Sequence, residues 1–154
     1  MKESTIILTY LVIPTITLIY ATIMLLNKWQ KTKTKYTKIY RELEVRELIA
    51  YWHCENGLKA PFFAWRILAK EIAARKYALS RKDMVAFFQT CAYDDILLDI
   101  LKGFTNCPTQ RKRFDKSILQ ELEHAIAHSN RKSDRDLTKY ICTTLQKLDG
   151  WGSK

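Results

Sequence analysis

The stretch IILTYLVIPTITLIYATIMLL, residues 6–26, is 21 residues long and contains no charged residue. A helix rises about 1.5 Å per residue, so a helix of this length matches the roughly 30 Å hydrocarbon layer of a bilayer. The run is longer than the apolar core of a cleaved signal peptide, and no small-x-small cleavage site follows it. We therefore predict an uncleaved transmembrane helix within residues 1–27.

The segment directly after the apolar run is basic, with five lysines before the first acid, Glu42. On the other side of the run, Lys2 is offset by Glu3. Because lysines beside a span are retained in the cytoplasm, we expect an inner (plasma) membrane protein with its N-terminus outside and its C-terminal domain cytoplasmic. The lysines are also suited to binding anionic lipid headgroups, so they can set the topology, bind lipid, or do both. They are Lys28, Lys31, Lys33, Lys35 and Lys38.

Charge and composition set bounds on the whole chain. The protein has 26 Lys and Arg against 16 Asp and Glu, a net charge of +10, with four Gly and three Pro in 154 residues. A chain this basic is expected to attract nucleic acid, anionic lipid or an acidic protein partner. The composition excludes collagen-like, low-complexity and fully disordered chains, and the length suffices for one compact domain beyond the apolar run.

Beyond the lysines, Gly and Pro occur only where helices are expected to end, at 57–61, 103–108 and 150–152. No stretch shows sustained period-two alternation, so we predict an all-α fold. The predicted parts are a tail and transmembrane helix at 1–27, a basic juxtamembrane stem at 28–38, a cytosolic bundle of about five helices at 39–149, and a tail at 150–154. The expected helices are 36–56 in continuation of the span, 61–79, 80–102, 109–128, and one capped by Ser133 and Asp136.

The third predicted helix, 80–102, is apolar on two opposite faces, with Met84 and Phe88 on one and Leu97 and Leu101 on the other. It is therefore expected to be central. It is also the acidic element of the domain, whereas the helix before it is basic, and a carboxylate near a core normally requires a cation. We expect desolvated ion pairs, with a catalytic or metal-binding carboxylate pair and an acidic partner-binding patch as alternatives. The residues expected in these pairs are Asp95, Asp99, Arg66 and Arg75.

His124 and His128 lie four residues apart, which is a zinc-ligand spacing on a helix. They are expected on the polar face, opposite the apolar stripe, and the Glu of an HExxH motif is absent, so we predict no metal there. The sequence also lacks phosphate-binding, dinucleotide-binding and nucleophile-elbow motifs, and we predict no enzyme activity, no catalytic residues and no cofactor. Four irregularly spaced cysteines are expected as reduced thiols. They are Cys54, Cys91, Cys107 and Cys142.

A short basic cluster, Arg111, Lys112 and Arg113, joins the lysines of the stem as an expected contact with a partner or an anionic surface. Aspartates interrupt the basic clusters, and no nucleic-acid-binding motif accompanies them, so nucleic-acid binding is the less favoured interpretation. The leading hypothesis is a membrane-anchored helical domain that binds another protein. The alternatives are a membrane-tethered nucleic-acid-binding protein and an immunity or toxin-regulating protein.

In topology and size the chain is similar to the entry-exclusion and superinfection-exclusion proteins of conjugative elements and phages. Some of these are small inner-membrane proteins with a cytosolic portion. The resemblance implies that the partner belongs to a membrane complex. It rests on the apolar run, the lysines and the length of the domain, and it transfers no site residue.

Overall fold

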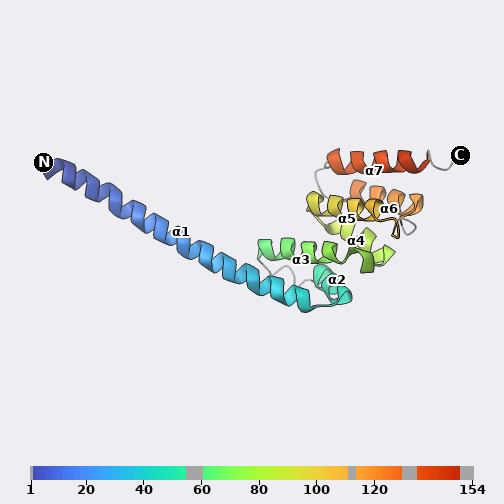
Figure 1. Ribbon diagram of the computed structural model, residues 1–154, viewed down its shortest axis with the longest axis horizontal. Helices are drawn as coiled ribbons and strands as arrows, with labels where there is room; N and C mark the ends of the chain where they lie inside the picture. Colours follow the sequence, from blue (N-terminus) through green and yellow to red (C-terminus); the bar gives the residue numbers. More distant parts are fainter. Residues whose placement is uncertain (1, 55–60, 111–113, 130–134, 150–154) are drawn as a thin grey trace. The chain divides into compact units, whose positions relative to one another are not determined.

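The computed structural model describes residues 2–54, 61–110, 114–129 and 135–149, and these parts are helical with no strand among them. The chain divides into two units, residues 1–39 and 40–154. The fold is thus all-α, with one long apolar N-terminal helix and a helical domain (Figure 1). The α-helices are α1 (Lys2–Glu42), α2 (Val45–His53), α3 (Phe62–Ala74), α4 (Arg81–Thr90), α5 (Asp94–Asn106), α6 (Lys116–Ala127) and α7 (Arg135–Asp149), and a 3-10 helix, η2 (Lys76–Ala78), follows α3.

The core of the second unit is formed by the apolar faces of α2 to α7. In this bundle α4 packs on α6, α2 on α3, and α6 on α7, while α5 contacts both α3 and α7. Trp52 lies between the rings of Trp65 and Phe87, with centroid distances of 5.2 and 4.9 Å, and its indole Nε1 donates to the Thr90 hydroxyl at 2.8 Å. The largest fully buried side chains include Tyr40, Phe87, Phe88, Phe104, Leu48, Leu68, Ile72, Leu97, Ile100 and Leu101.

The single helix predicted over 80–102 is wrong, because the structure has two helices there. Ser80 does cap α4 as expected, accepting from the backbone N–H of Asp83 at 3.1 Å, but α4 ends at Thr90. Cys91 is extended, and Asp94 and Asp95 supply the acids that favour the first turn of a new helix, α5. The turn lets each helix bury one apolar face, whereas a straight helix would have to bury two opposite faces along its whole length.

Gly103 was expected to end a helix, yet it lies inside α5, which continues to Asn106. A Cβ on Gly103 would collide with the side chain of Lys76, which passes over this position. The ammonium of Lys76 then lies 3.7 Å from the Asp99 carboxylate. Gly103 therefore leaves room for the Lys76 side chain and does not terminate the helix.

Three other boundaries differ from the sequence prediction. The expected helix 36–56 is interrupted after Glu42, because Glu44 begins α2 with a reciprocal capping box in which its N–H donates to Glu47 Oε2 at 2.8 Å. The expected helix 61–79 ends at Ala74 and is followed by η2. The expected helix 109–128 begins only at Lys116, where the Asp115 carboxylate accepts from the N–H of Ile118 at 2.9 Å.

The last helix, α7, has Leu137 and Ile141 in the core as predicted. Leu145 is half-buried. The proposed cap residue Ser133 and the side chain of Leu148 lie outside the described residues.

Candidate membrane helix and domain surface sites

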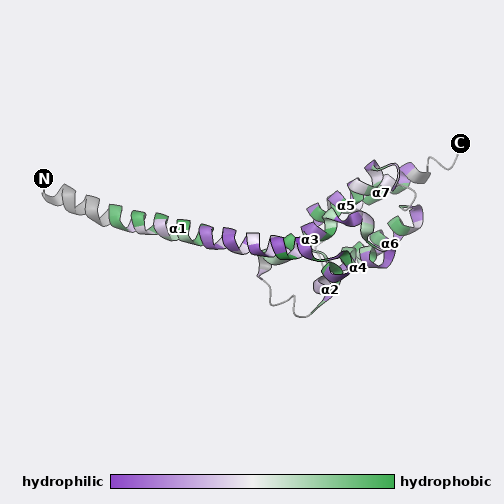
Figure 2. Cartoon of the chain, turned by 60° about the horizontal axis from the view of Figure 1, so that its bottom comes forward, coloured by the Kyte–Doolittle hydropathy of each residue, from purple (hydrophilic) through white to green (hydrophobic). Residues whose placement is uncertain are grey.

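From Val12 to Leu26, α1 presents its apolar side chains to the surroundings. Ile13 is 58% exposed, and Leu18 and Leu25 are each 68% exposed. It is the one helix in the described parts that is long and apolar enough to cross a membrane. In Figure 2 the coloured part of α1 begins with mainly apolar residues and continues with mainly hydrophilic ones. An exposed apolar surface of this extent is typical of a site of contact with a membrane or with another protein.

Three threonines of the apolar stretch hydrogen-bond to carbonyls of their own helix. Thr15 donates to the carbonyl of Val12 at 2.8 Å, and Thr22 donates to that of Leu18 at 2.7 Å. Thr17 donates to the carbonyls of Ile13 and Pro14, at 3.0 and 2.9 Å. In hydrocarbon an unsatisfied donor costs several kcal/mol, so these bonds make the threonines compatible with a span.

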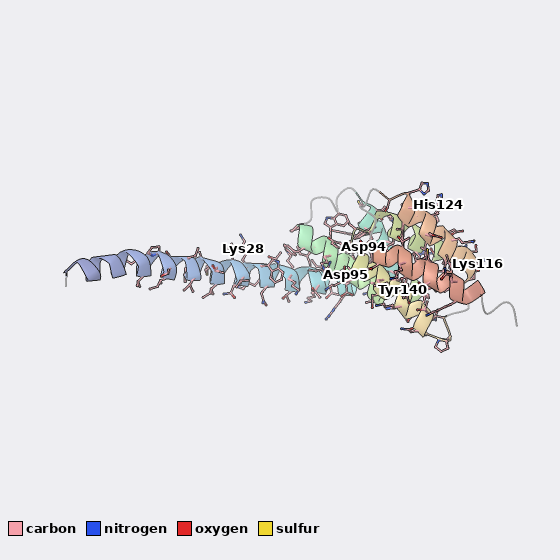
Figure 3. The ribbon with its side chains drawn as sticks, turned by 90° about the horizontal axis from the view of Figure 1, so that it is seen from above. Lys28, Asp94, Asp95, Lys116, His124 and Tyr140 are labelled. Carbon is pink, nitrogen blue, oxygen red and sulfur yellow. The ribbon has the colours of Figure 1, made fainter. Side chains whose placement is uncertain are left out.

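The five stem lysines, residues 28–38, are all exposed. Figure 3 shows the Lys28 side chain standing out from α1. The Lys33 ammonium lies 5.1 Å from the centre of the Trp29 ring, a cation–π contact. Thr32, Thr34 and Thr37 lie within α1, and each donates to a carbonyl four residues earlier at 2.8 to 2.9 Å.

Arg66 on α3 and Asp95 on α5 are brought together as a two-point contact, with guanidinium nitrogens 3.3 and 2.5 Å from the carboxylate oxygens. The Arg66 guanidinium also lies 5.2 Å from the centre of the Tyr93 ring. The prediction that this pair is desolvated is wrong, because the two side chains are 42% and 60% exposed. It is a surface pair, since the break before α5 turns Asp95 away from the core.

Contrary to the prediction, Asp99 is paired with Lys76, and within the described parts of the chain no ion pair joins Arg75 to an acid. The Arg75 guanidinium instead donates to the carbonyls of Arg41, Tyr40 and Leu43, at 2.7 Å for Arg41. Carbonyls at the C-terminal end of a helix have no hydrogen-bond donor within the helix, and a basic side chain can supply one. Arg75 is therefore the C-terminal cap of α1 within the domain.

The contact between Arg81 and Glu121 is not predicted from the sequence. Arg81 donates to both oxygens of Glu121, at 3.1 and 2.8 Å, and to the hydroxyl of Ser117 at 2.7 Å. The hydrogen bonds to Glu121 raise the pKa of the Arg81 guanidinium. The contact ties α4 to α6, and no spacing rule could have revealed it, because the residues are 40 positions apart.

A cleft of about 200 Å³ lies between α5 and α7. The Thr105 and Tyr140 hydroxyls are 2.9 Å apart in it, and the Phe114 ring is stacked on Phe104 at 5.0 Å. Thr105, Thr143 and Thr144 donate to carbonyls of their own helices, so their hydroxyls offer acceptors to the cleft. The lining residues are Thr105, Asn106, Phe114, Tyr140, Thr143, Thr144 and Lys147.

His124 and His128 lie on the exposed face of α6, as predicted. Their rings are stacked with centroids 3.9 Å apart, and His128 Nδ1 lies 2.9 Å from the carbonyl of His124. Among the described residues, no three His, Cys, Asp or Glu side chains are grouped so that they could hold a metal ion.

The thiols of Cys107 and Cys142 have different environments. The Thr109 hydroxyl hydrogen-bonds to the Cys107 sulfur at 3.2 Å, and this bond, with backbone N–H groups, lowers the pKa of the Cys107 thiol. Burial and the carboxylate of Glu123 raise the pKa of the Cys142 thiol. Cys54 is exposed and Cys91 is buried.

The basic cluster Arg111, Lys112 and Arg113 lies outside the described residues. The structure therefore places the other expected contact residues, the stem lysines, but not this cluster. Comparison with known proteins gave no match to a family model, to a curated protein or to a solved structure.

Proposed function

We propose that this protein is a single-pass inner-membrane protein whose C-terminal helical domain faces the cytoplasm and binds another protein. One observation carries the membrane part of this proposal: the exposure of an unbroken apolar stretch along α1. Water would make that exposure unfavourable by about 25 cal/mol per Å² of apolar surface, and a bilayer removes the cost. The internally bonded threonines support the same environment.

The orientation follows from the lysines. Five exposed lysines come directly after the apolar stretch, and the N-terminal side has Lys2 beside Glu3. This asymmetry favours retention of the lysine side in the cytoplasm.

A reporter fused after Lys154 tests the topology. A cytoplasmic reporter, such as a fluorescent protein that folds only in a reducing compartment, should be active there, and a periplasmic phosphatase should be inactive. The control fuses the same reporters after a variant in which the five lysines are replaced by Gln, which should give mixed orientations. Phosphatase activity in the unchanged chain would contradict the proposed orientation.

The protein-binding part is supported by the surface formed by Arg66, Tyr93 and Asp95. Tyr and Arg are enriched among the residues that dominate binding energies, and this Arg and Asp are both well exposed. The similarity in size and topology to exclusion proteins of conjugative elements and phages favours a partner within a membrane complex.

Affinity capture from detergent-solubilised membranes tests this part of the proposal. The double variant Arg66→Ala and Tyr93→Ala should lose the captured partner. Arg81→Ala, which removes an equally exposed arginine on the α4–α6 side, should retain it. Capture that is equal for both variants would contradict the assignment of this surface. Nucleic acid in place of a protein, released steeply by salt, would favour the alternative function.

A further inference from the structure

Four of the five stem lysines share one face of α1. Lys28, Lys31, Lys35 and Lys38 are spaced by three, four and three residues. At about 100° per residue this spacing places them within an arc of about 80° on the helix. Lys33 lies on the opposite side, where it contacts the Trp29 ring. We call the four aligned residues the lysine face.

We propose that the lysine face binds the phosphate groups of anionic phospholipids in the leaflet that the stem leaves. This inference rests on the proposed function, because it requires the apolar stretch of α1 to span the bilayer. The inference goes beyond the proposed function, because it assigns the lysines a ligand in addition to their role in setting the orientation of the protein.

The alignment of the four lysines on one face distinguishes lipid binding from a role in orientation alone. Orientation depends on how many lysines lie near the span and is indifferent to their angle around the helix. Where the helix crosses the headgroup layer, phosphates surround it, but beyond that layer a flat array of phosphates meets only the side toward which the helix tilts. Lysines placed for lipid should therefore share a face, as these four do, and all of them are exposed.

The position along the helix selects lipid as the partner. Asn27 alone separates Leu26, the last residue of the apolar stretch, from Lys28. The headgroup layer is about 5 to 7 Å thick on each side, and the lysine face extends about 15 Å along the axis. Lys28 and Lys31 thus reach the headgroups directly, and tilting the helix toward its lysine face lowers Lys35 and Lys38 to the same layer.

The local charge is also uncompensated within the stem. No acidic residue occurs between Asn27 and Arg41. Each basic residue close to an anionic surface contributes about 1 kcal/mol, which corresponds to about a fivefold preference. Trp29, on the opposite side of the helix, is a residue type that favours the membrane interface.

The test measures lipid selectivity of the full chain reconstituted in phosphatidylcholine bilayers. Electron spin resonance with spin-labelled lipids gives the association of phosphatidylglycerol relative to phosphatidylcholine. The unchanged protein should prefer phosphatidylglycerol about fivefold, and 0.5 M salt should reduce that preference.

A shuffled stem separates alignment from charge. The changes Lys31→Thr with Thr32→Lys, Thr34→Lys with Lys35→Thr, and Thr37→Lys with Lys38→Thr keep five lysines but distribute them around the helix. The preference should fall to below twofold. A shuffled stem that keeps the full preference would overturn the proposal, because charge alone would then account for binding.

A matched pair of single variants gives a second criterion. Lys35→Gln and Lys33→Gln each remove one charge, the first from the lysine face and the second from the opposite side. Because one of four equivalent lysines is lost, Lys35→Gln should lower the preference from about fivefold to about fourfold, and Lys33→Gln should leave it unchanged. Equal effects would overturn the proposal.

Alkaline carbonate extraction, performed on the same preparations, distinguishes the two levels of inference. A chain released by carbonate would contradict the membrane span and the lysine face together. A chain that resists extraction but shows no preference for phosphatidylglycerol would contradict the lysine face alone.

Discussion

Leu25 in α1 is 68% exposed, whereas Leu97 in α5 is fully buried, although both are leucines on helices of one chain. Across the described parts, 14 large apolar side chains are exposed, and all but Tyr51 and Tyr77 belong to the first unit, residues 1–39. The second unit buries its leucines, isoleucines and phenylalanines among neighbouring helices. The same residue types thus meet two environments.

The charges differ in the same way between the two units. The first 39 residues carry six Lys and one Glu, half of the net charge of +10, and most of it is on the stem. In the second unit, arginines and acids meet in cross-helix contacts such as Arg81 with Glu121. The first unit thus exposes apolar and basic side chains, whereas the second buries its apolar side chains and pairs charges across its helices.

Replacing buried and exposed leucines should show this difference most strongly. Leu97→Ala should lower the free energy of unfolding of the domain by about 2 to 5 kcal/mol, because it leaves a cavity in the core. Leu25→Ala should leave it unchanged. Guanidinium denaturation of the full chain in mild detergent, followed by tryptophan fluorescence, measures both. A comparable loss in Leu25→Ala would contradict the separation of the two units.

The cap supplied by Arg75 should have the next largest effect. Arg75→Gln shortens the side chain and removes the charge, so carbonyls at the end of α1 lose their donors. We expect a loss of about 1 to 3 kcal/mol in the free energy of unfolding. Arg46→Gln, at an exposed position on α2, is the matched control and should remain within about 0.5 kcal/mol. Equal stability of the two variants would show that water replaces the guanidinium.

The Arg66–Asp95 pair should contribute little to stability. Both partners are exposed, so a double-mutant cycle with Asp95→Ala and Arg66→Ala should give a coupling of about 0.2 to 1 kcal/mol, reduced further by salt. The sequence alone predicted a desolvated pair, for which the loss would be about 3 to 5 kcal/mol. A coupling well above about 1 kcal/mol that salt does not reduce would mean that this surface is covered in the native protein.

The smallest expected effect concerns the thiols, which we expect in reduced form. The pKa of Cys107 is lowered by the Thr109 hydroxyl, and the pKa of Cys142 is raised by burial. As the pH rises, thiolate should form first at Cys107, so iodoacetamide should modify it at a lower pH than Cys142. Mass spectrometry of quenched samples gives both rates. Thr109→Val should reduce the difference, and a disulfide in the untreated protein would contradict the expected compartment.

Most of the secondary structure was accessible to sequence reasoning, but the helix boundaries were less so. The capping pattern at Ser80 and the apolar stripe at Leu137 and Ile141 are local signals, and the structure confirms them. The break before Asp94 was missed, although two adjacent aspartates are typical of a first helical turn. An apolar segment with two faces predicts one central helix, because periodicity alone does not show where a helix ends.

The sequence by itself determined the all-helical fold, the apolar helix and the basic stem, since these depend on composition and on spacing within a few residues. The alignment of four lysines also follows from their spacing once the stem is helical. The tertiary structure alone decided which charges meet: Arg75 caps α1, Arg81 pairs with Glu121, and Lys76 crosses Gly103 to reach Asp99. Those contacts join residues 20 to 40 positions apart, and their geometry exists only after the apolar faces have packed and fixed the angles between the helices.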